Sequence, residues 1–126
     1  MRNDKPANGK LVLVVDDDRS VRESLSELLH MEGYAVLEAE NGQEAPEILE
    51  NTPHPPCMIV LDLAMPVMDG REFLKLRARD PALRRIPVVV VSGSPAPGEP
   101  FRGIVAYLQK PVEFDRLIAS IIAATG

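Results

Sequence analysis

The chain has 126 residues, of which 45% are hydrophobic, so it is long enough to bury one apolar core without disulfides. Its formal net charge of −5 and the absence of a lysine or arginine run argue against direct binding to nucleic acid. A lone cysteine, Cys57, excludes an internal disulfide, and no apolar run reaches membrane-spanning length, so we expect a cytoplasmic protein without a membrane partner.

Five short apolar segments alternate with stretches of helical periodicity, which is the pattern of a parallel sheet with crossover helices. We expect strands over residues 11–15, 34–38, 58–61, 87–91 and 104–108. The first, third and fourth contain the runs LVLVV, MIVL and VVVV, which are apolar at every position. Strands buried on both faces have this composition, so these three are the expected central strands.

The first helix is expected directly after the first strand. Ser20 and Glu23 have the spacing of a capping box that opens a helix, and Gly33 is placed to close it. One face of this helix carries an apolar stripe formed by Val21, Leu25, Leu28 and Leu29.

Three further helices complete the expected pattern. One covers about residues 41–50, and Pro46 should distort its first turn by removing a backbone hydrogen bond. Another opens at Asp69, with Glu72 at capping-box spacing, and runs to Arg79. The last is an amphipathic helix at the end of the chain, marked by Asp115, Leu117, Ile118, Ile121 and Ile122.

A fourth crossover helix would belong between residues 92 and 104, but the segment SGSPAPGEPFRG opposes it. It holds three prolines and three glycines, so we expect a loop or a short, irregular turn there. The expected organisation is one α/β domain over residues 10–126, with a five-stranded parallel sheet and an N-terminal tail over residues 1–9.

Acidic residues follow two of the expected central strands. Asp16, Asp17 and Asp18 come after the first strand, and Asp62 comes after the third. Taken alone, an acidic triplet is more often a helix-capping turn than a metal site, and that remains the interpretation of Asp18. Ligands of open α/β sheets bind at the carboxyl ends of the strands, where Asp62 also lies. With Asp62 beside them, a metal site becomes the preferred interpretation of Asp16 and Asp17. Converging carboxylates are costly unless a cation or a proton relieves the repulsion, and a hard divalent cation, Mg²⁺ or its substitute Mn²⁺, is the natural answer.

Two donors end the remaining strands at the same edge. Ser92 supplies a hydroxyl at the end of the fourth strand, and Lys110, followed by Pro111, supplies an ammonium at the end of the fifth. Either residue alone would be read as an ordinary turn or surface residue. Together, a carboxylate nucleophile, a metal, a hydroxyl and an ammonium are what phosphoryl transfer to an aspartate requires.

Four motifs in order, each at a strand end, resemble the receiver domains of two-component response regulators. They are VVDD (residues 14–17), LDLAMPVMDG (61–70), VVVSG (89–93) and YLQKP (107–111). The resemblance covers the chain from Lys10 onward. It implies a flavodoxin-like doubly wound sheet with strand order 2-1-3-4-5.

The resemblance also implies the role of each site residue. Asp62 would be the phosphoacceptor and a metal ligand, Asp17 a direct Mg²⁺ ligand and Asp16 a ligand largely through water, with the backbone carbonyl of Ala64 completing the protein's share. Lys110 and Ser92 would assist the transfer. Ser92 would then shift toward the phosphoryl group while the aromatic three residues before the lysine, which is Tyr107 in this chain, turns inward.

As a receiver the protein would act as a signalling switch and not as an enzyme that turns over a metabolite. The phosphoryl group would come from a histidine kinase or a histidine phosphotransfer protein, docked on the first helix around residues 19–29 and on loops beside the site. The output would be an unknown downstream protein, with no direct contact to nucleic acid.

Three alternatives remain open on the sequence. A phosphatase resembling the haloacid dehalogenases would use Asp16 as its nucleophile in the D-x-D of residues 16–18, but it needs a later acidic motif, and the fourth strand ends VVVSGS. A receiver fold that is not phosphorylated would be an interaction module only, which the irregular segment 94–103 alone favours. Flavin binding is opposed by the acidic loop after Val15, where a phosphate cradle would require donors.

Overall fold

The computed structural model describes residues 10–63, 70–93 and 103–125. Five strands form one parallel sheet in the order β2-β1-β3-β4-β5. This result confirms the flavodoxin-like α/β sheet and places the three all-apolar strands in its centre. The strands are β1 (Leu11–Val15), β2 (Ala35–Ala39), β3 (Met58–Asp62), β4 (Val88–Ser92) and β5 (Ile104–Gln109).

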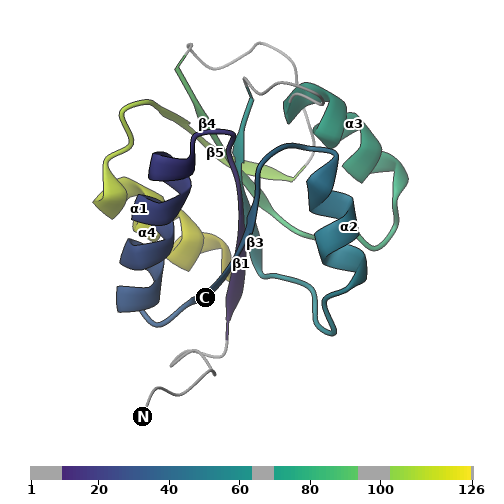
Figure 1. Cartoon of the computed structure of the whole chain (residues 1–126), viewed down its shortest axis with the longest axis horizontal. Helices are drawn as coiled ribbons and strands as arrows, with labels where there is room; N and C mark the ends of the chain where they lie inside the picture. The colour runs from purple at the N-terminus through teal and green to yellow at the C-terminus, as the bar shows by residue number, and fades with distance from the viewer. Residues whose placement is uncertain (1–9, 64–69, 94–102, 126) are drawn as a thin grey trace.

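Helices cover both faces of the sheet, α1 and α4 on one side and α2 and α3 on the other (Figure 1). They are α1 (Arg19–Met31), α2 (Glu44–Glu50), α3 (Gly70–Arg79) and α4 (Phe114–Thr125). None of these four is long and apolar enough to cross a membrane. The short or irregular helix expected between β4 and β5 falls on residues 94–102, and Asp69 was expected to open α3; both lie outside the described residues.

Alternation along the central strands builds two apolar cores. In β1, Val12 and Val14 pack on the α1 and α4 side, whereas Leu13 and Val15 pack on the α2 and α3 side, and all four are fully buried. Because each face is covered, the sheet leaves its carboxyl edge as the place where polar side chains can gather.

The start of α1 differs from the expectation. Asp18 is the N-cap, and its Oδ1 accepts hydrogen bonds from the backbone N–H groups of Ser20 and Val21 at 2.9 and 3.3 Å. The capping box at Ser20 and Glu23 is therefore wrong. A carboxylate two residues earlier caps the helix instead, and the helix begins at Arg19. The cap predicted for Asp18 and the end signalled by Gly33, with φ of 92°, are confirmed.

The start of α2 also differs. Oδ1 of Asn41 accepts from the N–H groups of Gln43 and Glu44, each at 2.9 Å, and the helix itself begins at Glu44 instead of near Asn41. Pro46 therefore lies in the first turn, where backbone N–H groups have no partner within the helix. The expected loss of a helical hydrogen bond at Pro46 is wrong for this reason.

Candidate functional site

Side chains from four strand ends meet at the carboxyl edge of the sheet. Asp62 is the last residue of β3 and not the first residue after it, because its pairing with Val91 extends the strand by one position. Ser92 likewise ends β4, and its carbonyl accepts a hydrogen bond of 2.8 Å from the N–H of Lys110. Strand pairing thus brings residues distant in sequence to one edge.

The acidic residues form the cluster that the motifs predict. Asp16, Asp17 and Asp62 each offer one carboxylate oxygen, and these atoms all lie within 4.8 Å of one another. Asp16 and Asp62 are only 2% and 3% exposed, whereas Asp17 faces solvent. Two buried carboxylates so close together repel each other unless positive charge lies between them.

Lys110 supplies positive charge to this cluster. Its Nζ lies 3.3 Å from Oδ2 of Asp16 and 3.3 Å from Oδ2 of Asp62. Partial burial by itself lowers the pKa of Lys110, but the charges and hydrogen bonds of the two carboxylates outweigh burial and hold that pKa above its ordinary value. The lysine is therefore an ammonium at neutral pH.

The donor set fits a divalent cation. Three carboxylates and one ammonium leave a formal charge of −2 at the cluster. Hard oxygen ligands of this kind suit Mg²⁺, which retains several waters and takes only one or two carboxylates from the protein. The carbonyl of Ala64, expected to be a ligand, lies outside the described residues.

Arg22 is a residue of the site that the sequence analysis missed. It is buried on α1, and its Nη1 donates a 2.7 Å hydrogen bond to the backbone carbonyl of Asp16. A signal was present, since Arg22 lies at helical spacing with the buried residues Leu25 and Leu29. A charged residue on an apolar stripe is expected to have a polar partner in the interior.

Gly70, the last residue of the motif LDLAMPVMDG, also supports the site. Its N–H donates to the carbonyl of Leu63 at 2.9 Å. A Cβ at this position would lie 2.6 Å from the carbonyl oxygen of Asp62 and 2.6 Å from Cα of Leu63. The start of α3 therefore packs directly on the backbone that carries Asp62, and only glycine allows that approach.

Ser92 and Tyr107, the other two predicted site residues, lie on the neighbouring strands β4 and β5. Ser92 is 7% exposed at the end of β4. Tyr107 is half-buried in β5 opposite Val90, and it packs against the core on the α2 and α3 side. Ser92 therefore stands at the strand end where the motifs place it, and Tyr107 stands within the neighbouring strand.

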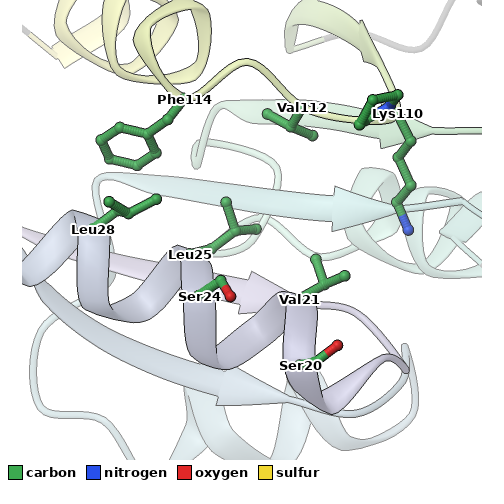
Figure 2. Close-up of a pocket in the computed structure, with 9 residues that line it drawn as sticks. Ser20, Val21, Ser24, Leu25, Leu28, Lys110, Val112 and Phe114 are labelled. Atoms are coloured by element: carbon green, nitrogen blue, oxygen red, sulfur yellow. The ribbon is translucent and has the colours of Figure 1, made fainter.

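A groove of about 550 Å³ runs beside the acidic cluster, between α1 and the segment after β5. Figure 2 shows apolar side chains of α1 facing Val112 and Phe114 across this groove. Lys110 lines the groove and also contacts the cluster, so the two are continuous. The α1 groove is lined by Ser20, Val21, Ser24, Leu25, Leu28, Lys110, Pro111, Val112 and Phe114.

A protein-family model described as the response regulator receiver domain matches residues 12–122. The chain belongs to this family. The receiver domain, with strand order β2-β1-β3-β4-β5, therefore accounts for nearly all of the sequence, and the resemblance drawn from the four motifs is confirmed.

Similar proteins include both longer regulators and single receiver domains. Response regulator MprA of Mycobacterium sp. (strain KMS) is 38% identical over 117 residues, which are 89% of this chain and 49% of MprA, so the chain spans about half of that relative. The polar-differentiation response regulator DivK of Brucella anthropi is 31% identical over 121 residues, 93% of this chain and 97% of DivK. The solved structure of chemotaxis response regulator CheY4 of Vibrio cholerae is 28% identical, with a TM-score of 0.79 over 91% of this chain and 98% of CheY4.

Proposed function

We propose that this receiver domain accepts a phosphoryl group on Asp62 from the phosphohistidine of a histidine kinase or a histidine phosphotransfer protein. The observation that carries the proposal is the pairing of Asp62 with Lys110 at 3.3 Å within the cluster of three carboxylates. A buried carboxylate with an ammonium and further acidic groups beside it has the parts of an aspartyl phosphoryl acceptor.

The transfer is a displacement at phosphorus. A carboxylate oxygen of Asp62 forms a bond to phosphorus, the bond between phosphorus and the histidine nitrogen breaks, and the imidazole keeps the electron pair. Water later cleaves the acyl phosphate and returns the carboxylate and inorganic phosphate. The protein is on this proposal a phosphoacceptor and switch with slow self-dephosphorylation, and not an enzyme of metabolism.

Each neighbouring residue has a role in this step. Asp17, Asp16 and Asp62 would hold Mg²⁺, or Mn²⁺ in its place, which when bound neutralises charge on the phosphoryl oxygens. Lys110 can exchange one of its carboxylate contacts for a phosphoryl oxygen, because its ammonium is a compact charge with three donors. The hydroxyl of Ser92 can donate to another phosphoryl oxygen.

Phosphorylation would shift the balance between two packings of the ends of β4 and β5. A dianion on Asp62 attracts the Ser92 hydroxyl, and Tyr107, half-buried on the neighbouring strand, would turn further inward. A downstream protein that binds only the second packing would read the signal.

The α1 groove is the proposed docking surface for the phosphohistidine donor. An amphipathic helix of the kinase or phosphotransfer protein would lay its apolar face on Val21, Leu25 and Phe114. Because Lys110 lines both this groove and the acidic cluster, a histidine on such a helix would be brought next to Asp62. The α1 groove is continuous with the site of Asp62, and this continuity supports a helix of the phosphohistidine donor as the partner that binds there.

Intact-mass measurement after incubation with acetyl phosphate and Mg²⁺ tests the proposal. The wild type and Asp115→Asn, an exposed control in α4, should each gain one phosphate, whereas Asp62→Asn should gain none. Adding EDTA should abolish labelling of the wild type. Asp16→Asn should be labelled more slowly than the wild type, because the change weakens a ligand of the cation but leaves the nucleophile Asp62 intact.

The same measurement separates the alternatives. Label that persists in Asp62→Asn but disappears in Asp16→Asn would assign the nucleophile to Asp16, as in the haloacid-dehalogenase hypothesis. No label in any variant, including the wild type with a phosphorylated phosphotransfer protein as donor, would leave a receiver fold that acts only by binding.

A further inference from the structure

Arg22 joins three elements next to the acidic cluster. Its side chain is 8% exposed, and Nη1 donates to the backbone carbonyl of Asp16 at 2.7 Å. Its Nε lies 3.4 Å from Oε1 of Glu38, and its Nη2 lies 3.9 Å from Oε1 of Glu40. The guanidinium thus ties α1 to the carboxyl ends of β1 and β2.

The contact with Arg22 lies in the backbone that leads from β1 to Asp17. The N–H of Asp16 donates to the carbonyl of Ala39 at 3.1 Å, and Oδ1 of Asp16 accepts from the N–H of Asp18 at 2.9 Å. The carbonyl of Asp16, held by Arg22, belongs to the same planar peptide unit as the N–H and Cα of Asp17. Fixing this carbonyl therefore fixes the plane from which Asp17 projects.

We propose that Arg22 is a positioning residue for the divalent cation, and this inference rests on the proposed function of the cluster. The guanidinium orients the peptide between Asp16 and Asp17, so that carboxylates from β1 and β3 converge. Without it, a buried carbonyl loses its charged donor and that peptide can rotate. Loss of a group that orients metal ligands lowers metal affinity by about 10- to 100-fold.

The sign of the change distinguishes positioning from simple charge. Arg22 is a cation beside three carboxylates, so its removal should strengthen Mg²⁺ binding if only Coulomb interactions mattered. Weaker binding after its removal therefore requires that the geometry of the carboxylates has changed.

Calorimetric titration of the full chain with Mg²⁺ tests the inference in five forms of the protein. Arg22→Met should raise the dissociation constant about tenfold, and Arg22→Lys should restore part of that loss. Arg19→Met removes the same charge from a side chain that is 82% exposed and forms an ion pair with Glu23 of its own helix, so the affinity of this variant for Mg²⁺ should not fall. Ile121→Val, at a buried position of α4, should lower the melting temperature without weakening Mg²⁺ binding.

The outcomes separate this inference from the proposed function. If the wild type binds Mg²⁺ and Arg22→Met binds it equally or more tightly, the positioning role is overturned and the phosphoacceptor site stands. If Ile121→Val weakens binding as much as Arg22→Met does, the effect is one of general stability and the role is also overturned. If the wild type binds no Mg²⁺, the cation site and the role of Arg22 fail together.

Discussion

Gly70→Ala is expected to impair the proposed phosphorylation of Asp62, although the changed residue carries no reacting group. A Cβ at position 70 would lie 2.6 Å from the carbonyl oxygen of Asp62 and from Cα of Leu63, both of them backbone atoms. An ordinary contact begins at 3.4 Å, so α3 or the end of β3 must move by about 0.8 Å. Neither neighbour is a flexible side chain that could simply turn away.

The size of this movement sets the expected loss. A displacement near 1 Å at a reacting group can lower a rate by about 100-fold, so we expect labelling of Asp62 to slow by roughly 10- to 100-fold. Overpacking costs about 1–3 kcal/mol, partly offset by the better helix propensity of alanine, so the free energy of unfolding should fall by about 1–2 kcal/mol. The domain should therefore remain folded at 25 °C.

Time-resolved intact-mass analysis with acetyl phosphate measures the rate, and urea denaturation measures the free energy of unfolding. Gly93→Ala is the matched control, because a Cβ at Gly93 meets nothing within 4 Å. Its free energy of unfolding should stay within about 0.5 kcal/mol of the wild type. Wild-type labelling and stability in Gly70→Ala would refute the inferred contact between α3 and the backbone of Asp62.

Three further variants test local features of the chain. Gly103→Ala should lower the free energy of unfolding by about 1–3 kcal/mol in urea denaturation, because Gly103 has a φ of 83° and a Cβ there would collide with the guanidinium of Arg77. Lys110→Met should lower the free energy of unfolding by the same amount at pH 7 and at pH 9, since the pKa of Lys110 is held above 10.5 and the wild-type lysine is charged at both. The difference in free energy of unfolding between wild type and variant should become smaller only above that pKa. Asp18→Ala should melt at a lower temperature at neutral pH. The side-chain hydrogen bond from Ser20 lowers the pKa of Asp18 below 3.8. The carboxylate of Asp18 therefore stabilises the fold at neutral pH, and this contribution is lost as the pH falls through its lowered pKa. If the wild type and Asp18→Ala still differ in melting temperature as much at low pH as at neutral pH, the cap is contradicted.

The fold was predictable because its signals are local and repeated. Runs such as LVLVV and VVVV report burial on both faces, which only crossover helices can provide, so the central strands follow from composition. The helix starts were less predictable. Asp18 and Ser20 are both good helix caps, and which of the two side chains caps the free N–H groups depends on where β1 ends and α1 begins.

The sequence by itself determined which residue types stand at the strand ends, and so named Asp16, Asp17, Asp62, Ser92 and Lys110 as one set. Only the tertiary structure decided which backbone groups support them. The contact of Arg22 with the carbonyl of Asp16 and the approach of Gly70 to the backbone of Asp62 depend on how α1 and α3 pack on the sheet. Spacing along the chain identifies the side chains of a motif and places Arg22 on the buried face of a helix, but it does not say which backbone atoms such residues contact.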